Sequence, residues 1–181
     1  MADSYQIRDQ EGLYFITCQV VGWVDVFSRK RYRDMILESL KYCTNHKGLI
    51  VYAYVIMTNH VHLIVRSGSG ELSNTVRDFK RFTSNQIMKD IASNEGESRR
   101  EWMQIVFEYH AKYNRRSGER QFWTHENHAV DLTSNSMIES RLSYIHGNPV
   151  RAGWVEKPED YLYSSAGSYV GRKGLLEIEM I

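Results

Sequence analysis

The chain has 181 residues, of which 42% are hydrophobic and 25% charged, so it holds enough apolar material for a core and is not a disordered polyelectrolyte. Its two cysteines are too few for a disulfide framework or a four-cysteine zinc site, and no apolar run is long enough to cross a bilayer. With a polar start that lacks an apolar signal stretch, these features predict a cytoplasmic protein with no membrane partner. We expect a single domain over residues 1–181, with an irregular tail from about residue 156.

The net charge of +1 is spread unevenly along the chain. Residues 13–155 hold 19 Lys and Arg against 14 Asp and Glu, whereas both ends are acidic. A mildly basic middle permits a polyanionic partner such as nucleic acid, although an ordinary solvated surface has the same composition.

The first half of the chain predicts strands and a helix. β-Branched and aromatic residues favour a strand over 13–21, and apolar residues then recur at helical intervals from Ser28 to about His46. Two apolar runs, 49–57 and 61–65, predict two more strands that are joined by a short turn as an antiparallel hairpin.

The middle of the chain predicts a long helix, followed by less regular structure. Ser73 can cap this helix, and mixed periodicity over 101–113 indicates a weaker one. Residues 114–120 form a basic loop in this interpretation, and the run 121–132 contains a strand.

A last helix is expected to begin at Ser134 or Ser136, and Pro149 is expected to stop or kink it. The order strand, helix, strand, strand, helix, strand, helix predicts a ferredoxin-like α+β sandwich, with a central antiparallel sheet and helices on one face. In that topology the first and third strands are central.

A pair of histidines, His60 and His62, begins the third predicted strand. Side chains alternate across a strand, so both imidazoles project from one face while Val61 points the other way. Two adjacent imidazoles form a compact pair of metal ligands, but the spacing alone fits an exposed surface pair equally well.

A second constellation lies in the last helix. Tyr144 and Asn148 are four residues apart, so on a helix they share a face and can address one site. Because Asn148 precedes a proline, its direction is less well defined than that of Tyr144. Taken alone, Tyr144 fits an ordinary packing or surface tyrosine.

The order and spacing of five segments make the chain resemble the single-tyrosine HUH transposases, in particular the REP-associated tyrosine transposases of the insertion-sequence-two-hundred-like type. These segments are YAYVIMTNHVHLIV at 52–65, DFKRFTSNQI at 78–87, FW at 122–123, YIHGNPVRAGWV at 144–155 and DYLYSSAGSY at 160–169. The resemblance extends over roughly residues 13–169. One departure is Thr58, where such relatives usually have proline, and it touches no proposed ligand.

This resemblance implies a metal-dependent endonuclease and strand transferase that acts on single-stranded or hairpin DNA. It implies that His60 and His62 bind Mg²⁺ or Mn²⁺ together with Asn148, and that Tyr144 is the nucleophile that forms a 5′-phosphotyrosine intermediate. Imidazole ligands leave the identity of the metal open. The resemblance also leaves open whether the protein is a monomer or a homodimer.

DNA contacts are expected where cations lie near aromatic rings, because cations hold phosphates and rings stack on unpaired bases. Phe79 and Phe82, on the same predicted helix as three of these cations, are instead expected in the core. The candidate DNA-binding residues are Arg77, Lys80, Arg81, Arg115, Arg116, Arg120, Trp123 and Arg151.

Two other functions remain open from the sequence. The first is a catalytically inactive, domesticated module that binds folded nucleic acid without cutting it. The second is an unrelated metal-dependent hydrolase that uses His125 and His128, although a strand-and-loop conformation would separate their side chains.

Overall fold

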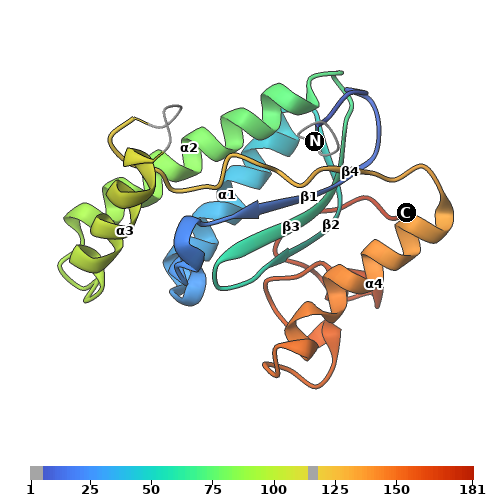
Figure 1. Ribbon diagram of the computed structural model, residues 1–181. Coiled ribbons are helices and arrows are strands. Elements are labelled where there is room, and N and C mark those ends of the chain that lie inside the picture. The colour runs from blue at the N-terminus through green and yellow to red at the C-terminus, as the bar shows by residue number, and fades with distance from the viewer. Residues whose placement is uncertain (1–5, 114–117) are drawn as a thin grey trace.

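The computed structural model describes residues 6–113 and 118–181 and shows a four-stranded antiparallel sheet in an α+β arrangement (Figure 1). The strand order is β2-β3-β1-β4, so the first and third strands are central, as the ferredoxin-like topology predicts. The strands are β1 (Tyr14–Gln19), β2 (Leu49–Ile56), β3 (His60–Ser67) and β4 (Val130–Asp131).

Two long helices, α1 (Lys30–Lys47) and α2 (Leu72–Ser93), cover one face of this sheet (Figure 1). Their apolar stripes bury the alternate strand residues that face them, among them Ile16 and Leu63. α1 ends at Gly48, whose φ of +66° is a left-handed conformation that glycine adopts without a steric penalty.

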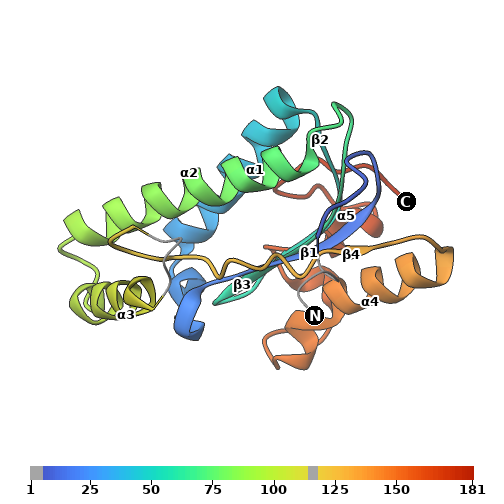
Figure 2. The ribbon, with the colours of Figure 1, turned by 45° about the horizontal axis from the view of Figure 1, so that its top comes forward.

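The helix α4 (Asn135–Arg151) lies on the opposite face of the sheet, against Phe15, Val55 and Ile64 (Figure 2). The α+β class and the antiparallel sheet are confirmed, but the expected placement of helices on one face holds only for α1 and α2. The strands explain the difference, because Phe15 and Ile64 leave an apolar patch on the second face that the Ile145 side of α4 buries.

The ends of α4 refine the prediction for this segment. Ser134 is its N-cap, and the Ser134 hydroxyl accepts a hydrogen bond from the Met137 amide at 3.4 Å. The helix does not stop at Pro149 but continues to Arg151. Pro149 lies in the last turn, so its missing N–H removes only one hydrogen bond near an end that frays anyway.

Shorter elements complete the fold. The helix α3 (Arg100–Lys112) confirms the weaker helix expected over 101–113, and it lies at the end of α2 (Figure 1). The remaining elements are α5 (Ala166–Tyr169) and the 3₁₀ turns η1 (Val21–Trp23), η2 (Val26–Ser28) and η3 (Pro158–Asp160).

Two segments pack along the edges of the sheet without long ladders. The run before β4 follows β1, with hydrogen bonds from the Thr17 amide to Asn127 and from the Thr124 amide to Gln19. The tail follows β2, where Ser164 forms an isolated bridge with Val55. None of the helices in the described residues has the length and apolarity of a membrane span.

Candidate functional site

His60 and His62 project from the same face of β3, and their ring centroids lie 4.6 Å apart. The intervening Val61 is buried in the core on the other face, as strand alternation requires. The pair therefore sits on the face that α4 covers.

His62 is almost fully buried and has one hydrogen-bond partner. Its Nδ1 lies 2.8 Å from the hydroxyl of Thr17, which stands opposite it on β1. Its Nε2 is buried without any partner. Burial, together with the nearby His60, Arg141 and Arg151, lowers the pKa of His62 to about 3, so the imidazole is neutral at neutral pH.

His60 is oriented by its neighbour Asn59. Its Nδ1 lies 2.6 Å from Asn59 Oδ1, and because an amide oxygen only accepts, the imidazole donates through Nδ1. The lone pair of His60 is therefore on Nε2. Burial lowers the pKa of His60 to about 4, so this imidazole is also neutral at neutral pH.

Tyr144 reaches this pair from α4 in the same chain. Its ring centroid lies 5.3 Å from that of His62 and 6.0 Å from that of Phe15. Ile145, the next residue, is fully buried and holds the helix against the sheet. The Tyr144 ring itself is 40% exposed, so a ligand can reach a side chain that is already beside the imidazoles.

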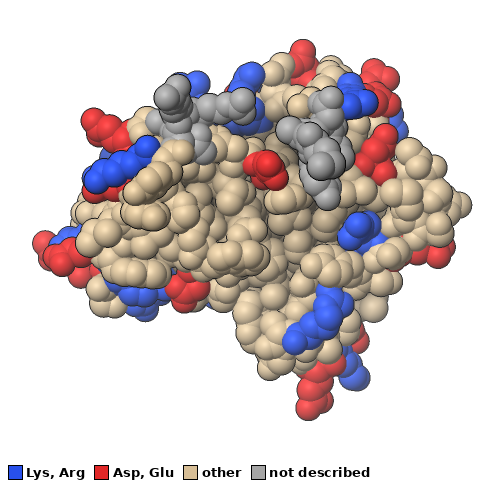
Figure 3. Space-filling view, viewed as in Figure 1, with Lys and Arg blue, Asp and Glu red and all other residues tan. Residues whose placement is uncertain are grey.

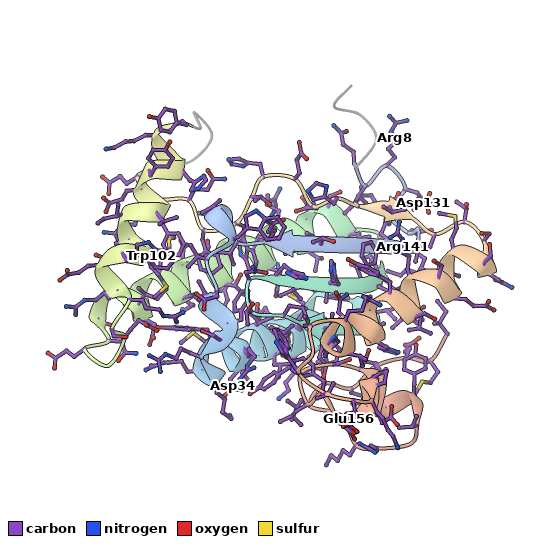
Figure 4. All side chains as sticks on the ribbon, turned by 60° about the horizontal axis from the view of Figure 1, so that its bottom comes forward. Arg8, Asp34, Trp102, Asp131, Arg141 and Glu156 are labelled. Atoms are coloured by element: carbon purple, nitrogen blue, oxygen red, sulfur yellow. The ribbon has the colours of Figure 1, made fainter. Side chains whose placement is uncertain are left out.

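Two arginines of α4 add positive charge around these rings. The Arg151 guanidinium carbon lies 4.8 Å from the Tyr144 ring centroid, and its Nη2 donates to the Tyr144 carbonyl oxygen. The guanidinium of Arg141 lies 4.9 Å from the Phe15 ring (Figure 4). With neutral histidines between them, these cations favour an anionic ligand.

Asn148 lies one helical turn after Tyr144, as the spacing predicts. Its side-chain nitrogen donates to the Tyr144 carbonyl oxygen at 3.0 Å. This hydrogen bond uses one end of the amide and leaves Oδ1 as its acceptor, which is the kind of atom that binds a hard cation.

The donor set fits a divalent cation. A buried nitrogen without a partner, such as His62 Nε2, is costly unless something binds it. The contacts to Thr17 and Asn59 are of the kind that orient metal-ligating imidazoles from behind. Across residues 6–113 and 118–181 no group of three His, Cys, Asp or Glu forms a metal site, so a cation here would rely on two imidazoles, an amide and water.

The predicted DNA-binding cations of α2 and Arg120 of the later loop line one groove of about 550 Å³. Arg77 and Arg81 of α2 line one side, and Arg120 lines the other. All three are exposed, and Arg120 makes a 3.5 Å ion pair with Glu108. On the face shown in Figure 3, charges of both signs are scattered among uncharged surface.

Three residues near this groove differ from expectation. Lys80 is partly buried, and its Nζ donates to the Thr124 carbonyl and to Asn127, so it holds the protein's own loop. Trp123 is 5% exposed and donates to Thr83, which leaves no ring face free for a base. Phe82, expected in the core, is 55% exposed in a groove between α1 and α2 that the buried Phe79 also lines.

In the part of the chain that the structure describes, His125 and His128 belong to no group of three His, Cys, Asp or Glu that could hold a metal ion. Arg115 and Arg116 lie outside the described residues. His125 and His128 lie in an irregular segment, and the ring of His128 is 3.9 Å from Glu126. Nothing in this arrangement supports the alternative hydrolase.

Three residues of the site were not identified by the spacing of the sequence motifs. Thr17 and Asn59 contact the two imidazoles, and Arg141 stands beside Phe15. Pairing the two predicted strands in antiparallel register would have placed Thr17 opposite His62. No comparable pattern marks Arg141, because its position depends on how α4 crosses the sheet.

Comparison with known proteins agrees with this fold. Residues 23–108 match the model of a family described as IS200-like transposase. This match covers just under half of the chain. A solved structure of a REP-associated tyrosine transposase bound to a REP hairpin is similar in fold, with a TM-score of 0.66 and 16% identity over 99% of this chain and 92% of that one. No curated protein sequence matches the chain.

Proposed function

We propose that this chain is a single-stranded DNA endonuclease and strand transferase that requires a divalent cation. The observation that carries the proposal is the position of Tyr144, whose ring lies 5.3 Å from an imidazole with a buried, unpartnered nitrogen. The match of residues 23–108 to the model of the IS200-like transposase family supports the reaction class. Because both side chains belong to one chain, we propose that Tyr144 acts in cis.

In this reaction Tyr144 is the nucleophile. Its phenol oxygen forms a bond to phosphorus, the phenol proton passes to water or a nearby base, and the bond to the 3′ oxygen breaks. The products are a 5′-phosphotyrosine and a free 3′-hydroxyl. The energy of the phosphodiester stays in the covalent link, so a second strand can be joined without nucleotide hydrolysis.

The residues proposed to hold the cation are His60, His62 and Asn148. A bound Mg²⁺ or Mn²⁺ would polarise the scissile phosphate and offset the charge that develops on it. The chain's own contribution is to keep both imidazoles neutral by burial and to fix their orientation through Thr17 and Asn59. Arg151 keeps a positive charge beside the Tyr144 ring, where the phosphate must arrive.

The proposed substrate is single-stranded DNA that carries a hairpin. The REP hairpin in the similar solved structure supports this choice. In this chain the groove between α2 and the loop that contains Arg120 offers exposed guanidinium groups for phosphates, at a distance from the catalytic face. Arg151 can contact phosphate at the site itself.

The test is incubation of the protein with hairpin-bearing single-stranded DNA and Mn²⁺, followed by denaturing electrophoresis. We expect a protein–DNA adduct linked through the 5′ phosphate, which is lost in Tyr144→Phe. Tyr161→Phe is the control, because that hydroxyl donates to the backbone carbonyl of Ile56 and not to an imidazole.

An adduct that persists in Tyr144→Phe would show that the nucleophile is wrong. Tight hairpin binding without any adduct, with Mg²⁺ or Mn²⁺, would instead favour the inactive binding module.

A further inference from the structure

Trp23 combines high exposure with an unfavourable backbone. Its side chain is 65% exposed, and its φ is +56°, a region that bulky residues rarely occupy. The preceding Gly22 has a similar φ of +61°, but glycine adopts it freely. Scattered exposed apolar residues are normal on protein surfaces, but one that also holds a strained conformation indicates a role.

The loop that contains Trp23 is firmly attached to the turn that precedes His60. The Val20 amide donates to the Asn59 carbonyl at 2.9 Å, and the Phe27 amide donates to the Thr58 carbonyl at 2.8 Å. Val21, Val24, Val26 and Phe27 are buried on the protein side. The exposure of Trp23 is therefore imposed by an ordered loop.

This loop is also connected to the catalytic site through a single side chain. Asn59 donates from Nδ2 to the Trp23 carbonyl at 3.3 Å, and its Oδ1 accepts from His60 Nδ1 at 2.6 Å. The one acidic residue of the loop, Asp25, is paired with Arg99 at 2.8 Å, so it opposes a nearby phosphate less than an unpaired carboxylate would.

We propose that Trp23 stacks on an unpaired base of the DNA strand whose phosphate is held at His60 and His62. This inference rests on the proposed function, because it places the strand at those imidazoles. Any of the four bases can stack on the indole ring. The affinity that Trp23 contributes should therefore require a base but depend little on which base it is. It would orient the strand as it leaves the site.

The experiment measures binding of a DNA hairpin that has single-stranded dT arms, and of a matched hairpin whose arms are abasic. Trp23→Ala is expected to weaken binding of the dT hairpin about tenfold and to leave binding of the abasic hairpin unchanged. Trp23→Phe retains most of the affinity. Trp102→Ala, at an exposed tryptophan of α3 far from α4 (Figure 4), is the matched control and has no effect.

Trp23→Gly separates binding from folding. Glycine tolerates the positive φ, so this variant is expected to melt at the wild-type temperature or above it, yet to lose the same affinity as Trp23→Ala. Wild-type binding by either variant, equal losses on both hairpins, or equal binding of the two hairpins by the wild type would overturn the inference. Because the assay needs no cleavage, its result is independent of whether Tyr144 forms an adduct.

Discussion

The two faces of the central sheet are built from the same strands but serve different purposes. Toward α1 and α2, β3 presents Val61, Leu63 and Val65, all buried in one large apolar cluster. Toward α4 it presents His60, His62 and Ile64, and only the last is apolar. On the first face the inward side chains of β3 are all apolar, whereas on the second face β3 keeps a buried imidazole nitrogen without a partner.

This difference shows how a small protein separates stability from chemistry. An apolar face with two covering helices can stabilise the fold by burial alone. The other face can then hold neutral histidines and an accessible tyrosine, which are costly to maintain. Neighbouring residues of one strand should therefore respond to mutation in opposite ways.

The largest effect is expected at His62. His62→Ala should reduce adduct formation by more than about 100-fold, because even an outer partner of a metal ligand contributes about 10–100-fold. Hairpin binding should stay near the wild-type value. The measurement is a time course of adduct formation with Mn²⁺, alongside filter binding. Undiminished cleavage would remove His62 from the ligand set.

Leu63→Ala, one residue along the same strand, should do the reverse. Leu63 is 2% exposed in the apolar cluster, so its truncation should lower the free energy of unfolding by about 2–5 kcal/mol. Urea denaturation measures this loss. Adduct formation per folded molecule should remain close to wild type at low temperature. A loss of cleavage without a loss of stability would show that the two faces do not have separate roles.

Thr17→Val should sharpen the comparison within the face that holds the two histidines. The substitution keeps the shape of the side chain but removes the hydroxyl that contacts His62 Nδ1. The apparent affinity for Mn²⁺ should fall about 10–100-fold, as expected for a group that orients a metal ligand. Titration of adduct formation with Mn²⁺ measures the change. Thr17→Ser, which keeps the hydroxyl, should restore most of it.

The smallest effect is expected at the groove of α2. Replacing Arg77 and Arg81 with alanine should weaken hairpin binding modestly and lower the slope of log affinity against log salt by about 1 for each phosphate that the variant no longer binds. Lys89→Ala removes an exposed cation of the same helix outside the groove, so it should leave the slope unchanged. An unchanged slope in the arginine variant would show that the groove does not bind phosphate.

Much of the fold could be predicted from local patterns. The strand 49–57 and the helix that ends before Gly48 follow from β-branched runs and helical periodicity, and both lie within a few residues of their expected bounds. The last helix was harder to delimit, because Pro149 costs little so close to an end. The strand expected within 121–132 is present as β4, but it has only two residues, and the rest of that run is irregular.

Side-chain roles could be predicted less well than the elements that contain them. Phe79 and Phe82 differ by three positions on one helix and line the same groove between α1 and α2, yet one is buried and the other exposed. Lys80 and Trp123 look like nucleic-acid contacts in sequence but hold the loop and the core in the structure. Whether a cation or a ring is available depends on contacts between distant segments.

By itself the sequence determined the order of the elements, the shared face of His60 and His62, and the helical spacing of Tyr144 and Asn148, because these depend on backbone periodicities of two and 3.6 residues. Only the tertiary structure decided that α4 crosses the sheet with Tyr144 beside His62, that Thr17 and Asn59 orient the imidazoles, and that Trp23 stays exposed on an ordered loop. These features arise from packing between segments far apart in the chain, which local periodicity does not encode.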